Sequence, residues 1–360
     1  MGSEWRTVRL GDEVTLQRGY DISRAELEVG PVPVIASSGT IGFHDKAVAE
    51  GPGVLLGRKG TLGTVWYTSG PYWPHSTALW VRDFHGNDPL FVYYFFKGFP
   101  VRQLDVGTAN PTLNRNHVHP LPAKWPPLDE QRRIACILGA LDEKIELNRR
   151  MSRTLDALAQ SVFESAFADV QARVEDGALG DLVDVVRVGV APGAADSDVP
   201  YVALEHLDSR STSVARWSPA TAATSTKSAF RRGDVLFGKL RPYFHKVALA
   251  RFDGVCSTDI LVLRPKTEDA TGFVLGCVNS DAFIDAMTAS SDGTKMPRAK
   301  WEDVVGYPIA SPAIPVMSRQ WMTVRPMLLR NGELTEESRR LVELRDALLP
   351  PLLSGEISVA

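Results

Sequence analysis

The second half of the chain repeats the first at a nearly constant distance along the sequence. Three residues have identical counterparts 181 positions later, namely Gly57 and Gly238, Ser76 and Ser257, and Thr77 and Thr258. The neighbouring residues agree, because GVLLGRKG resembles GDVLFGKL and STALWV resembles STDILV. The offset grows to 186 for a proline-rich stretch that begins at Gly107 and Gly293, and to 190 for Asp156 and Asp346. Loop insertions produce such growth, so the sequence predicts two copies of one domain.

Length and composition agree with two domains. A chain of 360 residues is too long for a single core. No apolar run approaches the roughly 20 residues that span a bilayer, and the polar start MGSEWRT is not typical of a secretory signal. Cys136, Cys256 and Cys277 lack the spacing of a zinc site or a disulfide framework. We therefore expect a cytoplasmic protein with reduced thiols and no membrane contact. Because the net charge of the chain is −3, any surface that binds nucleic acid must be a local cluster of positive charge.

Changes in residue composition along the sequence divide the chain into four regions. Residues 1–125 contain short runs of β-favouring residues between turns, with one buried helix expected over 90–99. Residues 126–175 are predicted to form a central helix, and residues 176–312 return to the β pattern. Residues 313–360 are predicted to hold a second helix. The fold class is therefore α+β, with two β-rich domains joined by two long helices.

The two helices carry apolar stripes that neither can bury alone. The first lacks glycine and proline over 140–167, has Asp129 as a candidate N-cap, and is expected to run for about 40 residues, or about 60 Å. Its stripe is Leu141, Ile145, Leu155, Leu158 and Val162, interrupted by Asn148 and Ser152. The second stripe, of leucines, begins near Asn331 and Gly332. We expect an antiparallel coiled coil with pseudo-two-fold symmetry. The alternative, in which each helix packs on its own domain, stays open.

Catalytic motifs are not evident in the sequence. GRKGT (57–61) lacks the spacing of a phosphate-binding loop. Asp142, Glu143 and Lys144 are consecutive on a helix and cannot converge on one metal ion. His117 and His119 have no cysteine or carboxylate at ligand spacing. The sequence therefore predicts a non-catalytic protein without a cofactor or a metal site.

Polar and aromatic residues suited to DNA gather at similar places in both copies. In the first copy they are Arg58, Lys59, Thr61, Tyr67, Trp73, His75, Ser76, Thr77, Thr108, Asn110, Thr112, Asn114, Arg115 and Asn116. In the second copy they are Lys239, Arg241, Tyr243, His245, Lys246, Ser257, Thr258, Thr294, Lys295, Arg298 and Lys300. Any one of them fits a solvated surface equally well, but the recurrence favours DNA contact. The shared serine-threonine pairs also fit a purely structural role.

Some of these residues are better suited to phosphates and others to bases. Arg58, Lys59, Lys239 and Arg241 lie in corresponding turns of both copies, so we expect them to contact phosphates. The string around Asn114 and Arg115 has no match in the second half, which favours base readout there.

Two segments resemble the specificity subunit of type I restriction-modification systems. They are PLPAKWPPLDEQRRIACILGALDEKI, which opens the central helix, and ELRDALLPPLLSGEI near the end. The resemblance implies two target recognition domains that each read half of a bipartite site in double-stranded DNA. It also implies helices that dock two methyltransferase subunits, in a complex with restriction subunits that move along and cut DNA. One departure is IPVMSRQW in the second copy, where the first has LDEQRRI. A protein-interaction adaptor of a DNA-defence complex, without base readout, is the alternative.

Overall fold

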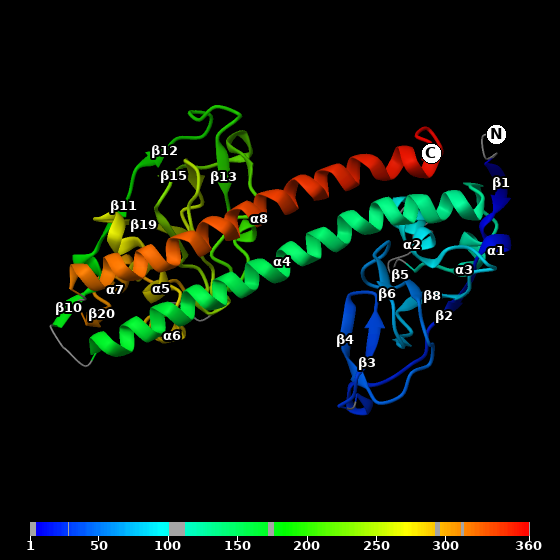
Figure 1. Cartoon of the computed structure of the whole chain (residues 1–360), viewed down its shortest axis with the longest axis horizontal. Helices are drawn as coiled ribbons and strands as arrows, with labels where there is room; N and C mark the ends of the chain where they lie inside the picture. The colour runs from blue at the N-terminus through cyan, green and yellow to red at the C-terminus, as the bar shows by residue number, and fades with distance from the viewer. Residues whose placement is uncertain are drawn as a thin grey trace. The chain divides into compact units, whose positions relative to one another are not determined.

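The protein consists of two compact units in the computed structural model, which describes residues 5–27, 29–100, 112–171, 176–291, 296–310 and 313–359 (Figure 1). The first unit combines Met1–Glu143 with Val342–Ala360, and the second is Lys144–Leu341. These units cut across both long helices, α4 (Leu128–Gln171) and α8 (Ile314–Ser354), which contribute residues to each. The domain boundaries expected at 125, 175 and 312 stay a prediction.

The first unit contains a four-stranded sheet in the order β2-β8-β5-β6, a three-stranded sheet in the order β4-β3-β7 and a separate pair, β1-β9. Its strands are β1 (Arg6–Arg9), β2 (Thr15–Arg18), β3 (Val32–Ala36), β4 (Gly39–His44), β5 (Gly53–Gly57), β6 (Val65–Thr68), β7 (Trp73–Pro74), β8 (Ala78–Asp83) and β9 (Pro122–Trp125). Its short helices are α1 (Leu10–Glu13), α2 (Pro89–Gly98) and α3 (Arg115–Val118), with a 3₁₀ turn η1 (Arg24–Glu26).

The second unit contains a four-stranded sheet in the order β11-β19-β16-β17, a five-stranded sheet in the order β12-β15-β18-β13-β14 and a pair, β10-β20. Its strands are β10 (Asp176–Ala178), β11 (Val183–Val186), β12 (Gly189–Val190), β13 (Pro200–Val202), β14 (Ser218–Pro219), β15 (Lys227–Phe230), β16 (Val235–Gly238), β17 (Val247–Leu249), β18 (Gly254–Cys256), β19 (Ile260–Pro265) and β20 (Pro308–Ala310). Its short helices are α5 (Thr271–Val278), α6 (Asp281–Ala289) and α7 (Trp301–Val305). Its 3₁₀ turns are η3 (Leu179–Asp181), η4 (Leu204–His206), η5 (Ala220–Ala222), η6 (Pro242–Phe244) and η7 (Glu268–Ala270).

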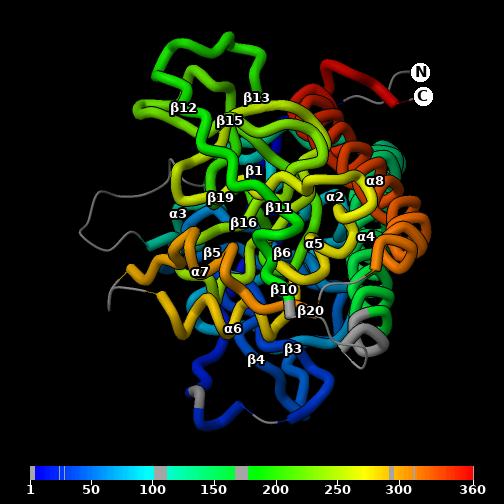
Figure 2. The backbone as a smooth tube through the Cα atoms, turned by 90° about the vertical axis from the view of Figure 1, so that its left-hand side faces the viewer, coloured from blue at the N-terminus to red at the C-terminus, as the bar shows by residue number. Residues whose placement is uncertain are grey.

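The two four-stranded sheets have the same topology and the same register. In the first, Leu56 of β5 lies between Val65 of β6 and Leu79 of β8. In the second, Phe237 of β16 lies between Val247 of β17 and Leu261 of β19, and the neighbouring strands β11, β19 and β16 can be followed in Figure 2. Among the described strands, both units also hold a parallel pair, β3-β7 in the first and β13-β18 in the second. The duplication predicted from the sequence is therefore confirmed at the level of the fold.

The predicted match of Ser76 and Thr77 to Ser257 and Thr258 is wrong by one residue. The backbone N–H of Arg58 donates to the carbonyl of Thr77 over 2.8 Å, whereas the N–H of Lys239 donates to that of Asp259 over 2.9 Å. Because Arg58 and Lys239 both follow the glycine that ends the central strand, Thr77 corresponds to Asp259. The second copy has one extra residue before this point, and chance repetition of Ser-Thr concealed it.

The predicted helix over 90–99 is present as α2, which begins one residue earlier. Asp88 caps it, since its carboxylate accepts from the N–H of Phe91 over 2.9 Å. The buried face of α2 packs in one hydrophobic cluster with the sheet, with Ile134 and Leu138 of α4, and with Leu349 and Leu352 of α8. The core of the first unit is thus built from both ends of the chain.

The central helix α4 has 44 residues and agrees with the prediction, although Asp129 lies in its first turn and not at its N-cap. The second helix runs from Ile314 to Ser354, within the region 313–360 predicted to hold it, so it begins well before its leucine stripe near Asn331 and Gly332. Asn331 is fully buried, and its side chain donates to Asp156 over 2.6 Å, so tertiary bonding outweighs its weak helix propensity. None of the helices in the described ranges is long and apolar enough to cross a membrane.

Within the second unit, α4 and α8 run antiparallel and meet through polar residues. Lys144 pairs with Glu337 over 3.4 Å, and further along α4 the hydroxyl of Ser152 donates to Asn331, which lies earlier on α8. The predicted seam is wrong at Leu158, which is 49% exposed, because Asp156 takes the buried place. The same helices also pack on the domain, as in the contact of Phe163 with Phe273 of α5. Coiled-coil packing and packing on a domain therefore occur together.

Candidate nucleic-acid interface

The strands β2 and β5 of the first unit end, and β8 begins, at one end of the four-stranded sheet, which we call the first loop end. Here the N–H groups of Arg58 and Lys59 donate to Thr77 over 2.8 and 3.1 Å. The N–H of Leu113 in turn donates to the carbonyl of Arg58 over 3.0 Å. Three segments that are distant in sequence are thereby fixed around Arg58.

A tight turn after β5 positions the first loop end. A Cβ atom at Gly57 would lie 2.0 Å from the carbonyl oxygen of Thr61, so no side chain fits there. Gly60 and Gly63 have φ values of 79° and 75°, in the left-handed region that glycine tolerates. The glycine pattern noted in the sequence therefore builds the turn that carries Arg58 and Lys59.

Two arginines and one aspartate lie close together at the first loop end. The Arg18 side chain donates to Asp21 over 2.9 Å, and Nη1 of Arg58 donates to the carbonyl of Ser76 over 3.3 Å. Burial and the neighbouring Arg18 lower the pKa of Arg58, whereas Asp21 opposes this. The hydroxyl of Ser76, followed by Arg18, lowers the pKa of Asp21. Two guanidinium groups held within reach of each other attract an anion such as a DNA phosphate.

The second unit repeats this arrangement at the corresponding end of its sheet, the second loop end. The N–H of Ala299 donates to the carbonyl of Lys239 over 3.0 Å, as Leu113 does to Arg58. A surface hollow lies here, lined by Lys239, Leu261, Met296, Arg298, Ala299, Lys300, Trp301 and Glu302. The guanidinium carbon of Arg187 lies 3.9 Å from the centre of the Trp301 ring, a cation–π contact. Basic and aromatic groups thus surround the hollow.

The hydrogen bonds and strand registers make the two loop ends comparable residue by residue. Basic residues recur at two positions, Arg18 with Arg187 and Arg58 with Lys239. Four further positions differ, namely Thr77 with Asp259, Thr112 with Arg298, Asn114 with Lys300, and Arg115 with Trp301. Cations shared by both units suit contacts with DNA phosphates, which are present at every site. Polar groups that differ between the units suit the reading of different bases.

Of the other predicted residues of the first copy, some lie around the first loop end, whereas Tyr67 lies away from it. Thr61 is exposed in the turn after Gly57. His75 bonds to the Thr77 hydroxyl over 2.8 Å, and Ser76 is 8% exposed, so both are packed within the fold. Tyr67 lies further along β6, where its ring packs against Tyr93 at 5.7 Å between centroids. The structure does not bring Tyr67 to the Arg58 cluster.

Asn114 and Arg115 open the short helix α3. The Asn114 side chain accepts from the N–H of Asn116 over 3.0 Å, which makes it the N-cap. Arg115 is exposed and close enough to His119 to lower the pKa of that ring, after the larger effect of burial. Arg115 is therefore available to a ligand, whereas the oxygen of Asn114 is occupied by the helix.

Four predicted residues of the second copy lie around η6. Arg241 and His245 flank this turn with φ values of 52° and 51°. His245 is 4% exposed, and its Nε2 lies 3.0 Å from the carbonyl oxygen of Asn279, so it holds the fold. Lys246 donates to the carbonyl of Leu204 over 2.6 Å. Tyr243, in contrast, is 51% exposed and open to a partner.

The remaining predicted residues are Ser257, Thr258, Arg298 and Lys300, and four that are not described. Ser257 accepts from the N–H of Asp259 over 3.2 Å, a structural bond, while Thr258 is exposed. Arg298 and Lys300 are exposed beside the hollow. Thr108, Asn110, Thr294 and Lys295 lie outside the described residues.

Sequence reasoning missed Arg18, Asp21, Arg187, Asp259 and Trp301. Arg18 is the last residue of β2 and Arg187 directly follows β11, the corresponding strand, but TLQR and VDVVR are too different in sequence to be aligned by eye. Only the strand register places them together. In the parts of the chain that the structure describes, no three histidine, cysteine, aspartate or glutamate residues gather as a metal site.

Known proteins resemble the chain in sequence and in fold. Residues 2–157 match the family model of the type I restriction modification DNA specificity domain. The EcoDI specificity subunit of Escherichia coli is 32% identical over 92 residues, which are 26% of this chain and 20% of that relative. The MjaIX specificity subunit of Methanocaldococcus jannaschii is 21% identical over 336 residues, which are 85% of this chain and 78% of that relative.

A crystal structure has the same fold along nearly the whole chain. It is the S subunit of a type I restriction-modification system from M. genitalium, with a TM-score of 0.65 and 13% identity, covering 98% of this chain and 96% of that one. The family model covers the first loop end, and the fold match extends over both units. On these grounds residues 2–157 belong to the family of type I restriction modification DNA specificity domains, and the fold of a type I S subunit extends along nearly the whole chain.

Proposed function

We propose that this chain reads a bipartite site in double-stranded DNA, with the first loop end on one half-site and the second loop end on the other. The observation that supports this most is the residue-by-residue correspondence of the loop ends. Arg18 and Arg58 match Arg187 and Lys239, while Arg115 stands where the second unit has Trp301. Phosphate contacts are common to all sequences, and base contacts are not.

The role proposed is that of a non-catalytic subunit in the cytoplasm. It directs two methyltransferase subunits and the restriction subunits of a type I complex to the site that it binds. The polar helix pair of the second unit, with Asn148 donating to Glu337 over 2.9 Å, gives the two helices a defined register. A fixed register is what a spacer between two DNA-reading domains requires.

The test is a gel shift of duplex DNA with the purified chain and its methyltransferase. We expect a sequence-selective complex whose affinity falls with salt, because phosphate binding releases counterions. Methylome sequencing of a host that expresses both proteins then gives the two half-sites. An adaptor without base readout would show no sequence preference, and that result would overturn the proposal.

A further inference from the structure

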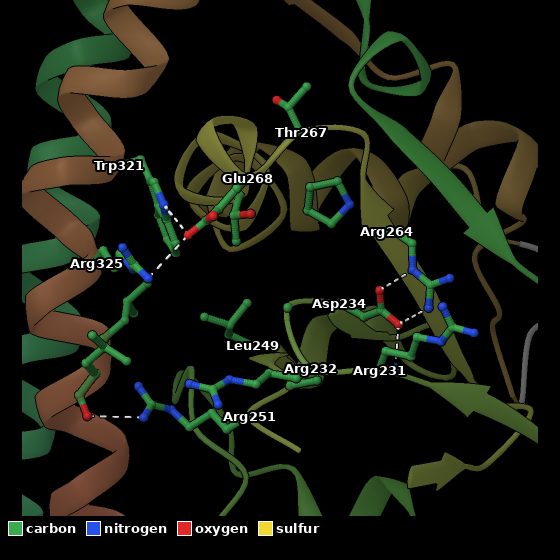
Figure 3. A pocket seen from close by; sticks show the side chains of 16 residues that line it. Arg231, Arg232, Asp234, Leu249, Arg251, Arg264, Thr267, Glu268, Trp321 and Arg325 are labelled. Carbon is green, nitrogen blue, oxygen red and sulfur yellow. Dashed lines mark hydrogen bonds and ion pairs between the residues drawn. The ribbon is translucent and has the colours of Figure 1, made fainter. Parts of the chain in front are cut away.

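A pocket of about 470 Å³ lies in the second unit, away from the second loop end. One wall is apolar and combines Leu249 and Ala250 of the sheet with Trp321, Leu328 and Leu329 of α8. Several arginines are among the other residues that line the pocket, as Figure 3 shows. A volume of this size is in the range of small-molecule sites, roughly 300–1,000 Å³.

The pocket has more positive than negative charge. Five arginines line it, Arg231, Arg232, Arg251, Arg264 and Arg325, against two acids, Asp234 and Glu268. Both acids are already paired, because Arg264 forms two bonds of 2.7 Å with Asp234, and Arg325 lies 3.4 Å from Glu268. Three arginines therefore remain in excess.

In the part of the chain that the structure describes, none of these three guanidinium groups forms an ion pair with a carboxylate. The backbone N–H groups of Arg231 and Arg232 donate to the carboxylates of Asp234 and Asp253, but their guanidinium groups form no ion pair within the described ranges. Arg251 donates to the carbonyl of Leu329 over 3.1 Å. It lies so close to α8 that a Cβ atom on Gly332 would be 1.8 Å from its Nη1.

Arg232 and Arg251 point the same way at one end of the pocket (Figure 3). Burial lowers the pKa of Arg251, and repulsion from Arg232 lowers it further, while Glu333 and Asp156 oppose the change. Like charges gathered beside an apolar wall are costly to the fold. A bound anion relieves that cost.

We propose that this pocket binds a phosphorylated small molecule of nucleotide size. Arg232 and Arg251 hold the phosphates, because the planar guanidinium fork matches phosphate oxygens in pairs. The apolar part of the ligand lies against Leu249, Leu328 and Trp321. No residue of the pocket belongs to the second loop end, so the site is independent of base reading.

The experiment is isothermal titration calorimetry of the full chain with ATP, adenosine and inorganic phosphate. We expect ATP to bind and adenosine not to bind, and inorganic phosphate to bind more weakly than ATP. Arg232→Gln and Arg251→Gln should each weaken ATP binding by about tenfold, the usual effect of losing one charged hydrogen bond. Arg319→Gln, an exposed arginine of the same helix α8 outside the pocket, is the matched control. Unchanged melting temperatures without ligand confirm that the variants fold.

Three outcomes would overturn the proposal. If adenosine bound as tightly as ATP, the phosphates would have no role in binding. If inorganic phosphate bound as tightly as ATP, the apolar wall would have no role. Random duplex DNA that displaces ATP, with Arg232→Gln weakening both, would make this surface a DNA backbone contact. Loss of sequence-selective DNA binding in the unmodified chain would count against the proposed function alone.

Discussion

Nε of Arg298 donates to Oδ1 of Asp259 over 3.0 Å, at two positions where the first unit has Thr112 and Thr77. The carboxylate fixes the direction of a long, otherwise mobile side chain. An arginine held in this way loses less rotamer freedom on binding guanine, and its remaining N–H groups stay available. The second loop end therefore differs from the first in chemistry as well as in sequence.

Arg298→Ala should relax one position of the second half-site and cost about 1–3 kcal/mol on the cognate DNA, the usual worth of a bidentate base contact. Arg115→Ala should do the same in the first half-site. Selection of bound duplexes from a randomised library measures both. Unaltered base preferences in both variants would contradict the assignment of readout to these positions.

Lys239→Ala should weaken binding to all sequences about equally, because Lys239 has a basic counterpart, Arg58, in the other unit. The slope of log affinity against log salt should fall by about one. Filter binding of cognate and random duplexes from low to high salt gives the slope. Arg153→Ala, on an exposed part of α4, serves as the control. If Lys239→Ala changed the bases that the protein selects, Lys239 would be a base contact and not a phosphate contact.

The buried Asp156 should make stability depend on pH. Burial raises its pKa above the ordinary value, although hydrogen bonds from Thr212 and Asn331 act in the opposite direction. The folded state thus holds this proton more tightly than the unfolded state. The contribution is fully present below the unfolded pKa of about 3.9 and is lost as the pH rises through the folded pKa.

Urea unfolding of the full chain at a series of pH values tests this. The free energy of unfolding, taken relative to the Asp156→Asn variant, should fall as the pH rises from about 4, where an ordinary aspartate titrates. Asp346→Asn is the control, because Asp346 lies on the other long helix, α8, and its side chain is 57% exposed. If the difference in the free energy of unfolding between the two proteins did not change with pH, burial would not raise the pKa of Asp156.

Gly276→Ala should destabilise the second unit by about 1–3 kcal/mol through overpacking. Its Cβ would lie 2.2 Å from the ring of Phe163, which is buried and cannot move aside. The small gain in helix propensity does not offset such a clash. Gly70→Ala, which meets nothing within 4 Å, should leave the melting temperature nearly unchanged. Equal melting temperatures for the two variants, measured by calorimetry, would contradict this packing.

The periodicity of turns and the repeated glycines were enough to predict the two copies. A Cβ atom would be crowded at both glycines, by the carbonyl of Thr61 at 2.0 Å for Gly57 and by the Leu204 side chain at 2.9 Å for Gly238. The long α4 followed from the lack of glycine and proline over 140–167. In the second long helix, Asn331 and Gly332 resemble a helix end, and only the bonds to Asp156 and the contact with Arg251 explain why α8 passes through them.

The candidate interface was less accessible to sequence reasoning. Lys239 and Arg298 were found because basic residues cluster there, but His245 and Lys246 have the same chemistry and are committed to the fold. Arg18 and Arg187 were missed since their partnership depends on strand register. Burial and register are long-range properties, and residue type alone does not encode them.

The first unit is assembled from two separate stretches of chain, and the second is one uninterrupted stretch between them. Leu349 and Leu352 of the last stretch lie in the core of the first unit, and a Cβ atom on Gly355 would lie 3.0 Å from Trp5. A gene fragment that stops before residue 342 therefore leaves that core incomplete. Conversely, replacing codons 144–341 in frame exchanges one recognition cassette and preserves every piece of the other. Under the proposed function, recombination at two points within the helices is a direct route to a new half-site.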